Sequence, residues 1–368
     1  MSAKYWLGLM SGTSMDAVDT VLVSFDDQRL KILDSFSLPY PEDLRVRLLQ
    51  AIGNHADPDE LGELDTLTGQ HFALAANELI HRAEIESTDI HAIGSHGQTI
   101  RHQPSGTAPF SIQIGNPSVI VETTGVTTVS NFRNRDLAAG GQGAPLVPAF
   151  HRWLFRSTKQ DRCILNLGGI GNITWLPADT AAAITGFDTG PANALMDAWC
   201  YDQTGKHYDE SGQWASEGNV NSELLETLLS DAYFVKPPPK STGKERFNLG
   251  WLNTHLQRFD DVPPEDVQRT LLQLTATTIL RQLPEPSTGM AVYACGGGTF
   301  NPLLMEELRR GLGSVALRTT AELGLDPQWV EPVAFAWLAR QTLRGLAGNV
   351  PEVTGAKGER VLGAIHPA

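Results

Sequence analysis

Residues 6–23 read WLGLMSGTSMDAVDTVLV, in which two apolar runs flank a short turn rich in hydroxyl groups. Residues 5–10 and 20–25 have the length and apolar content of strands, and the segment between them has turn residues, so the pattern predicts a β-hairpin. The turn region also offers hydroxyls, a glycine that lets backbone approach a ligand, and two carboxylates, Asp16 and Asp19. These groups suit a phosphate and, through water, Mg²⁺, although a solvated hairpin needs no ligand.

Length and charge limit the classes of protein to consider. A chain of 368 residues is too long for one ordinary core, so we expect two domains. The formal net charge of −14 and the lack of clustered Lys and Arg argue against a nucleic-acid surface. No apolar run approaches membrane-spanning length, and the first apolar stretch is too short for a signal peptide. We therefore expect a cytoplasmic protein that binds no membrane.

The cysteines point to the same compartment. Cys163, Cys200 and Cys295 lie in apolar contexts without the C-x-x-C or Cys/His spacing of a metal site. The sequence predicts buried thiols in a reducing compartment and no zinc site.

Apolar periodicity predicts an alternation of strands and helices. Further strands are expected at 90–95, 110–114, 119–122, 126–129, 162–167, 184–187 and 290–294, and helices at 41–52, 61–83, 195–201, 264–283 and 302–312. The Gly-rich, charged segment 131–148 is the candidate crossing between domains, and the Pro- and Lys-rich segment 236–248 resembles a surface loop.

Three strands run into turns that combine Gly with Thr or Asn, at 168–174, 188–194 and 295–301. A single Gly-rich turn is weak evidence, because glycines also serve tight turns that bind nothing. Three such turns in one chain, divided between two expected domains, favour a nucleotide site.

The motifs carry a family resemblance. They are GTSMD (12–16), SHGQT (95–99), GGQGAPL (140–146), NLGGIGNIT (166–174), FDTGP (187–191), PKSTG (239–243) and GGGTFN (296–301). In wording and spacing they closely resemble the anhydro-N-acetylmuramic acid kinases, from residue 6 to about residue 340. The resemblance implies an α/β, two-lobed actin-like ATPase fold, as in hexokinase, Hsp70 and actin, with ATP in a central interdomain cleft. It implies an N-terminal lobe of residues 1–133 and 345–368 and a C-terminal lobe of residues 134–344.

The resemblance also implies the site. Its ATP-binding residues would be Gly12, Thr13, Ser14, Met15, Asp16, Ala17, Val18, Asp19, Gly168, Gly169, Asn172, Gly296, Gly297, Gly298 and Asn301. Its sugar-binding residues would be His96, Thr99, Arg133, Arg135 and Glu331, since hydroxyls invite His or Thr and a carboxylate invites an Arg fork. The sequence does not decide which arginine faces the sugar; the other is expected to pair with Asp136.

The implied reaction uses ATP to phosphorylate O6 of 1,6-anhydro-N-acetylmuramic acid while water opens the anhydro bridge, giving N-acetylmuramic acid 6-phosphate in cell-wall recycling. Water attacking an anomeric carbon needs a general base, and Asp188 has the residue type and the family position for it. The alternative for Asp188 is a turn or helix-cap carboxylate. Mg²⁺ is expected as cofactor, held mainly by phosphates and water with Asp188 or Asp16 in reach. The family further suggests a homodimer.

Two departures from the family pattern stand out, because Ala17 and Ala192 occupy positions that the family usually fills with Gly. Alanine would strain the backbone there if φ were positive. Other functions stay open: an actin-fold kinase for another amino sugar, or a non-enzymatic actin- or Hsp70-like ATP-driven module. A dinucleotide-dependent oxidoreductase ranks last, because the third Gly of its fingerprint is replaced by Thr174.

Overall fold

The computed structural model describes residues 4–12, 15–26, 29–285 and 289–368, and it divides into two compact units. Unit 1 comprises residues 1–154 and 329–368, and unit 2 comprises residues 155–328. The division predicted from the sequence stays a prediction, and it differs from these units by assigning residues 134–154 and 329–344 to the second lobe. In the structure, residues 330–343 form a helix that packs on the first strands of the chain, which is why they belong to unit 1.

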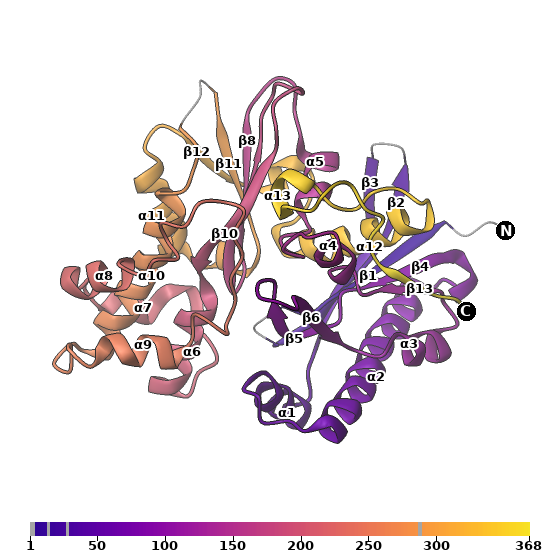
Figure 1. Cartoon of the computed structure of the whole chain (residues 1–368), viewed down its shortest axis with the longest axis horizontal. Coiled ribbons are helices and arrows are strands. Elements are labelled where there is room, and N and C mark those ends of the chain that lie inside the picture. The colour runs from indigo at the N-terminus through magenta and orange to yellow at the C-terminus, as the bar shows by residue number, and fades with distance from the viewer. Residues whose placement is uncertain (1–3, 13–14, 27–28, 286–288) are drawn as a thin grey trace. The chain divides into compact units, whose positions relative to one another are not determined.

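Unit 1 is built on a six-stranded mixed sheet (Figure 1). Its elements are β1 (Tyr5–Met10), β2 (Ala17–Asp26), β3 (Arg29–Pro39), α1 (Glu42–Ile52), α2 (Pro58–Arg82), β4 (Ile90–Ser95), β5 (Gln98–Gln103), β6 (Phe110–Ile114), α3 (Pro117–Thr124), β7 (Thr128–Ser130), α4 (Asn134–Ala138), α5 (Pro148–Phe155), α12 (Val330–Leu343), α13 (Pro351–Thr354) and β13 (Ala364–His366). The strand order is β13-β7-β4-β1-β2-β3, and β5 pairs with β6 in a separate ribbon.

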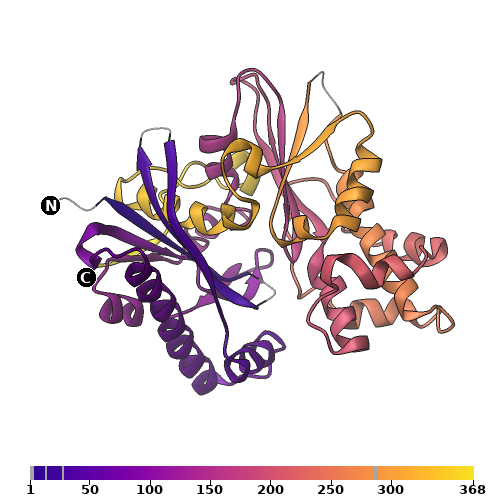
Figure 2. The same cartoon turned by 180° about the vertical axis from the view of Figure 1, so that it is seen from behind.

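Unit 2 is built on a five-stranded mixed sheet. Its elements are β8 (Arg162–Leu167), β9 (Ile170–Leu176), β10 (Thr185–Pro191), α6 (Asn193–Thr204), α7 (Gln213–Glu217), α8 (Ser222–Leu229), α9 (Leu249–Leu256), α10 (Pro264–Leu280), β11 (Ala291–Cys295), α11 (Pro302–Leu312) and β12 (Ala316–Thr319). The strand order is β10-β9-β8-β11-β12, so β8 and β11 lie side by side although more than 120 residues separate them (Figure 2).

The two sheets share one topology. In each, three consecutive strands form an antiparallel meander, a fourth strand lies parallel to the first, and a fifth lies parallel to the fourth. The order is β3-β2-β1-β4-β7 in unit 1 and β10-β9-β8-β11-β12 in unit 2. The predicted α/β class is therefore confirmed, and the predicted hairpin at the start of the chain is β1–β2. The arrangement of two lobes around a cleft stays a prediction.

Side-chain alternation along β1 explains how helices cover the sheet of unit 1. Leu7 and Leu9 point into a core shared with α2, and Gly8 points to the opposite face, against α12. A Cβ on Gly8 would lie 1.9 Å from the carbonyl oxygen of Pro332, and one on Gly94 of β4 would lie 2.1 Å from that of Phe335. The helix α12 thus rests directly on the backbone of β1 and β4.

Some local predictions were wrong. Residues 119–122 belong to helix α3, because Asn116 caps its N-terminus, Pro117 opens it and the left-handed Gly125 ends it. Residues 170–174 are part of strand β9, so the Gly-rich turn is shorter than predicted. In the predicted surface loop 236–248, Lys240 and Phe247 are buried. The prediction of buried thiols is confirmed for all three cysteines.

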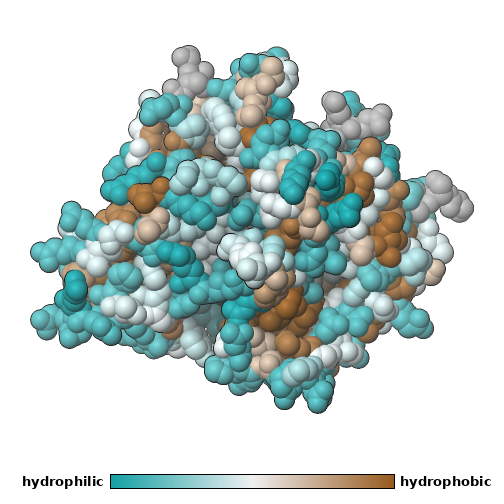
Figure 3. Space-filling view, viewed as in Figure 1, coloured by the Kyte–Doolittle hydropathy of each residue, from teal (hydrophilic) through white to brown (hydrophobic). Residues whose placement is uncertain are grey.

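The surface of unit 1 carries some apolar side chains. Phe110 and Ile112 of β6 are each about two-fifths exposed, and a brown patch lies over β5 and β6 in the space-filling view (Figure 3). In the described part of the chain, no helix has both the length and the apolar character needed to cross a membrane.

Candidate functional site

The turn after β1 is tied to the segment that follows β4. Ser11 Oγ donates to Gln98 Oε1 at 2.7 Å, and Gln98 Nε2 lies 3.4 Å from the carbonyl oxygen of Gly12. Both strands run parallel, so their carboxyl ends meet at one edge of the sheet, where open α/β sheets place ligands. Thr13 and Ser14, predicted to bind phosphate, lie outside the described residues.

The remaining residues of the first predicted phosphate segment contribute unequally. Met15 and Val18 are fully buried in the core of unit 1. Asp16 is exposed, and Asp19 accepts a hydrogen bond from the Ser37 hydroxyl. Ala17 opens strand β2 and is not among the described non-glycine residues with positive φ.

Arg133 and His96 form the centre of the predicted sugar site in unit 1. Arg133 Nη2 lies 2.9 Å and Nε lies 3.3 Å from His96 Nε2, and the His96 ring packs at 4.7 Å from the ring of Phe335. Burial, with a further contribution from the Arg133 charge, lowers the pKa of His96 to about 3, so the imidazole is neutral and accepts the N–H of Arg133. Arg135, by contrast, is exposed. Arg133 is therefore the more buried of the two arginines, and which of them faces the sugar stays a prediction.

Asp136 shapes the loop around Arg133. Its carboxylate accepts hydrogen bonds from Gly143 N, Asn349 Nδ2 and Thr354 Oγ1, each at 2.8 Å. Arg133 Nη1 in turn donates to the carbonyl oxygen of Gly143 at 2.8 Å. The buried aspartate thus fixes the Gly-rich loop, and the loop fixes Arg133.

Glu331 and Thr99 lie on elements that meet the same sheet edge. Glu331 is partly exposed in the first turn of α12, one turn before Phe335, which contacts His96. Thr99 Oγ1 accepts a hydrogen bond from Gln113 Nε2 at 3.2 Å within the β5–β6 ribbon. The predicted sugar residues other than Arg135 therefore gather on one side of unit 1.

In unit 2, the three predicted Gly-rich turns pack together. The carbonyl oxygens of Gly168 and Gly169 accept hydrogen bonds from the backbone N–H groups of residues 192–194 at 3.0 to 3.1 Å. A Cβ on Gly298 would lie 2.7 Å from Leu167 Cβ, whereas one on Gly297 would meet no atom within 4 Å. Gly298 is thus needed for close packing, and Gly297 leaves room beside the turn.

Two other predicted positions take structural roles. Asn301 caps helix α11 by accepting the N–H of Leu304 at 3.1 Å. Ala192 precedes helix α6 with φ of −123°, so this position of the family motif does not take the positive φ that would favour glycine.

Asp188 lies in strand β10 directly opposite Asn172 of β9, beside the Gly-rich turn. The pairing shifts register between Asp188 and Gly190, and such bulges re-aim side chains next to active sites. Asp188 is 6% exposed, and its Oδ2 accepts the backbone N–H of Thr242 at 3.0 Å. The cap of the next helix is Ala192, so Asp188 is not a helix cap.

Sequence reasoning missed Lys240, which is 2% exposed in unit 2. Its Nζ donates to the carbonyl oxygen of Tyr233 at 3.2 Å and lies over the rings of Tyr233 and Phe187. Burial lowers the pKa of Lys240 to about 8, and the Asp188 charge opposes this shift. In the sequence, the PKSTG motif (239–243) was the only indication that Lys240 has a role, and the prolines before it suggest an exposed loop instead.

Among the described residues, no group of three or more His, Cys, Asp or Glu side chains is placed to hold a metal ion. Mg²⁺ usually keeps several waters and binds through one or two carboxylates together with substrate phosphates. Single carboxylates such as Asp188 or Asp16 fit that mode of binding.

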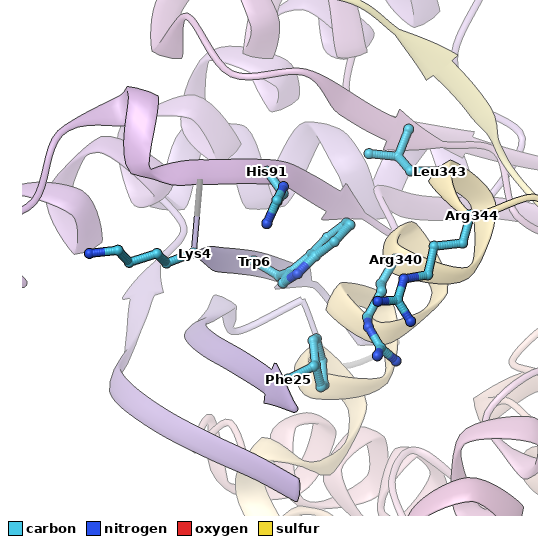
Figure 4. Close-up of a pocket in the computed structure, with 7 residues that line it drawn as sticks. All are labelled: Lys4, Trp6, Phe25, His91, Arg340, Leu343 and Arg344. Atoms are coloured by element: carbon cyan, nitrogen blue, oxygen red, sulfur yellow. The ribbon is translucent and has the colours of Figure 1, made fainter. Parts of the chain in front are cut away.

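A pocket in unit 1 lies at the other end of the same strands (Figure 4). Trp6 and His91 line it from the beginnings of β1 and β4, and Arg340 and Arg344 line it from the C-terminal part of α12. None of the predicted site residues is among those lining it. It is therefore separate from the sheet edge that carries His96.

Comparisons with known proteins agree on one family. The family model for anhydro-N-acetylmuramic acid kinase matches residues 4–368. The anhydro-N-acetylmuramic acid kinase of Coxiella burnetii (strain Dugway 5J108-111) is 47% identical over 370 residues, covering 100% of this chain and 98% of the relative. The protein of the same name from Shewanella halifaxensis is 45% identical over 369 residues and covers both chains completely.

Solved structures are more distant. Component A of (R)-2-hydroxyglutaryl-CoA dehydratase from Acidaminococcus fermentans is 12% identical with a TM-score of 0.46, over 91% of this chain and 96% of its own. A ROK family glucokinase from Streptomyces griseus, in complex with glucose and AMPPNP, is 14% identical with a TM-score of 0.38, over 92% and 99%.

The repeated sheet topology and the match to a kinase family define the class: the chain is an actin-like ATPase-fold phosphotransferase. Within that class, it belongs to the anhydro-N-acetylmuramic acid kinase family.

Proposed function

We propose that this chain uses ATP to phosphorylate O6 of 1,6-anhydro-N-acetylmuramic acid and opens the anhydro ring with water, giving N-acetylmuramic acid 6-phosphate and ADP. The observation that carries the proposal is the position of Asp188, buried directly opposite Asn172 beside the Gly-rich β8–β9 turn. A carboxylate beside a phosphate-type turn suits a reaction that joins proton abstraction to phosphoryl transfer. Family membership supports the choice of sugar.

Asp188 acts as the general base in this proposal. Water attacks C1, its proton passes to the Asp188 carboxylate, the C1–O6 bond breaks, and the released O6 attacks the γ-phosphorus of ATP with ADP leaving. The hydrogen bond from Thr242 N to Oδ2 helps to fix the orientation of the carboxylate.

The sugar side of the site is assigned to unit 1. Arg133 has the forked geometry that binds a carboxylate such as the lactyl group of the substrate. The neutral His96 orients that fork through its Nε2, and Thr99 and Glu331 lie nearby to bind hydroxyl and amide groups. Arg135 is assigned no contact, because it is exposed.

ATP is assigned to the Gly-rich turns at Gly12, Gly168–Gly169 and Gly296–Gly298, where backbone approaches a ligand without a side chain. Mg²⁺ is assigned mainly to phosphate oxygens and water, and when bound it neutralises charge on the phosphoryl group. We also propose a cytoplasmic location and a homodimer, in line with the buried free thiols and with the family resemblance.

One experiment tests the proposal. The protein is incubated with ATP, Mg²⁺ and 1,6-anhydro-N-acetylmuramic acid, with ordinary N-acetylmuramic acid in a parallel reaction, and the products are weighed by mass spectrometry. We expect a product heavier than the anhydro-sugar by one phosphate plus one water. A product heavier by phosphate alone would remove the ring-opening step, and turnover of the ordinary sugar alone would favour a kinase for another amino sugar.

A further inference from the structure

The loop that carries Lys240 is joined to the strand that carries Asp188 by several contacts. Asp188 N donates to the carbonyl oxygen of Lys240 at 3.3 Å, and Thr242 N donates to Asp188 Oδ2 at 3.0 Å. Tyr233 closes the connection, because its hydroxyl donates to the carbonyl oxygen of Asp188 at 2.8 Å while its own carbonyl accepts from Lys240 Nζ at 3.2 Å. Asp188, Tyr233 and Lys240 therefore form one hydrogen-bonded ring of contacts.

Burial of the Lys240 side chain at this position costs free energy. An ammonium group loses much of its hydration when it is buried, and a residue with 2% exposure is retained there only with compensation. One neutral carbonyl and the faces of Tyr233 and Phe187 compensate in part. The charge of Asp188, which is held to the Lys240 loop by the hydrogen bonds above, also favours the charged form of Lys240.

A second network holds the loop in place from the other side. Asp231 accepts the backbone N–H of Tyr233 at 2.8 Å and the indole N–H of Trp251 at 3.0 Å, and it pairs with Arg246 at 2.5 Å. These groups keep Tyr233 against Asp188 without involving Lys240. These contacts hold the loop in place by themselves, so the buried Lys240 ammonium is not required to keep the loop against Asp188.

We propose that Lys240 is a positioning residue of the catalytic site, whose buried ammonium holds the Asp188 carboxylate in its charged, proton-accepting form and in its orientation toward the substrate. The inference rests on the proposed role of Asp188 as general base. Lys240 acts through Asp188 and needs no contact with either substrate.

The test is a double-mutant cycle of Lys240→Met and Asp188→Asn in the full chain. Met has nearly the length of Lys without its charge, and Lys236→Met is the matched control, because Lys236 is exposed on the same loop. Steady-state kinetics with ATP and the anhydro-sugar give kcat and KM, and thermal melting gives a readout that is independent of activity.

We expect Lys240→Met to lower kcat by about 10- to 100-fold, as is usual for partners that orient a catalytic group, with both KM values changed little. In the Asp188→Asn background, Lys240→Met should cause no further loss, because the charge it supports is already gone. Lys236→Met should behave as the wild type. A kcat for Lys240→Met within about threefold of the wild type, or losses that multiply in the double variant, would overturn the inference.

Melting temperatures of the same variants test the coupling between Lys240 and Asp188 independently of activity. Asp188→Asn leaves the Lys240 ammonium without its charged partner and should lower the melting temperature, and adding Lys240→Met should restore part of the loss. If Lys240→Met does not fold, Lys240→Gln replaces it, and an unchanged melting temperature of Asp188→Asn alone overturns the inference. Failure of the proposed function is distinguishable, because the wild type would then give no phosphorylated sugar while the melting cycle still reports on the pair.

Discussion

The contact between α12 and the sheet of unit 1 gives the sharpest prediction, because the same substitution should have opposite effects at two glycines. Gly94→Ala places a Cβ 2.1 Å from the carbonyl oxygen of Phe335, whereas ordinary contact begins near 3.4 Å. The helix would have to retreat by about 1.3 Å. In a packed core such overpacking costs about 1–3 kcal/mol. The expected fall in melting temperature is about 2–4 °C per kcal/mol for a unit of this size.

Gly62→Ala is the matched control. Gly62 is exposed in helix α2, and a Cβ there would meet no atom within 4 Å. Alanine in a helix interior is about 0.5–1 kcal/mol more favourable than glycine, so this variant should melt at a slightly higher temperature than the wild type.

The same variants separate packing from function. Helix α12 carries Glu331 and Phe335, and Phe335 contacts His96. Gly94→Ala should therefore weaken binding of the anhydro-sugar in calorimetry, whereas Gly62→Ala should leave it unchanged. A Gly94→Ala protein that melts at or above the wild-type temperature would refute the close backbone contact, and an unchanged sugar affinity would refute the link from α12 to the site.

Three further predictions concern named side chains. Asp188→Asn should keep ATP and sugar affinity but lower kcat by about 10²- to 10⁴-fold, the usual cost of removing a general base, and a near-wild-type rate would remove Asp188 from the mechanism. Arg133→Met should weaken sugar binding by about 10-fold or more while Arg135→Met should not, and equal losses in calorimetry would contradict the assignment. Burial lowers the pKa values of His96, His102 and His151 to about 3, so below pH 6.5 the unfolded chain takes up protons that the folded chain does not. The free energy of unfolding should therefore fall as pH falls from 6.5 toward 3. In His151→Phe this fall, measured by urea titrations, should be smaller by up to about 1.4 kcal/mol per pH unit. An identical dependence of stability on pH in the variant and the wild type would contradict this prediction.

Strands with a clear apolar pattern were the most predictable part of the fold. Residues 5–10, 90–95 and 162–167 form strands with the predicted limits, because buried parallel or central strands read as short continuous apolar runs. Helix α3 was mistaken for a strand because its β-branched Val and Ile favour strands in isolation. The capping residue Asn116 and the left-handed Gly125 set the limits of the helix in that segment.

The candidate site was only partly predictable, for a different reason. The motifs and the family resemblance made Asp188, His96 and Arg133 candidates, but they did not rank Arg133 above Arg135. Which of two nearby arginines points inward depends on the backbone path around buried Asp136, and Asp136 is fixed by Asn349 and Thr354, more than 200 residues away. Local sequence does not contain that information.

Charge explains why buried cations matter in this acidic chain. With a formal net charge of −14, the protein repels ATP and a carboxylated sugar at long range, although salt limits this repulsion to about 8 Å at physiological ionic strength. Binding then depends on local donors. Arg133 lies against a neutral histidine that does not cancel its charge, which suits recognition of an anion. Lys240 donates to the carbonyl oxygen of Tyr233 and is acted on by the charge of Asp188, which suits the proposed role of supporting a base. The surroundings of each cation therefore support different proposed roles: binding of an anion for Arg133 and support of the proposed base for Lys240.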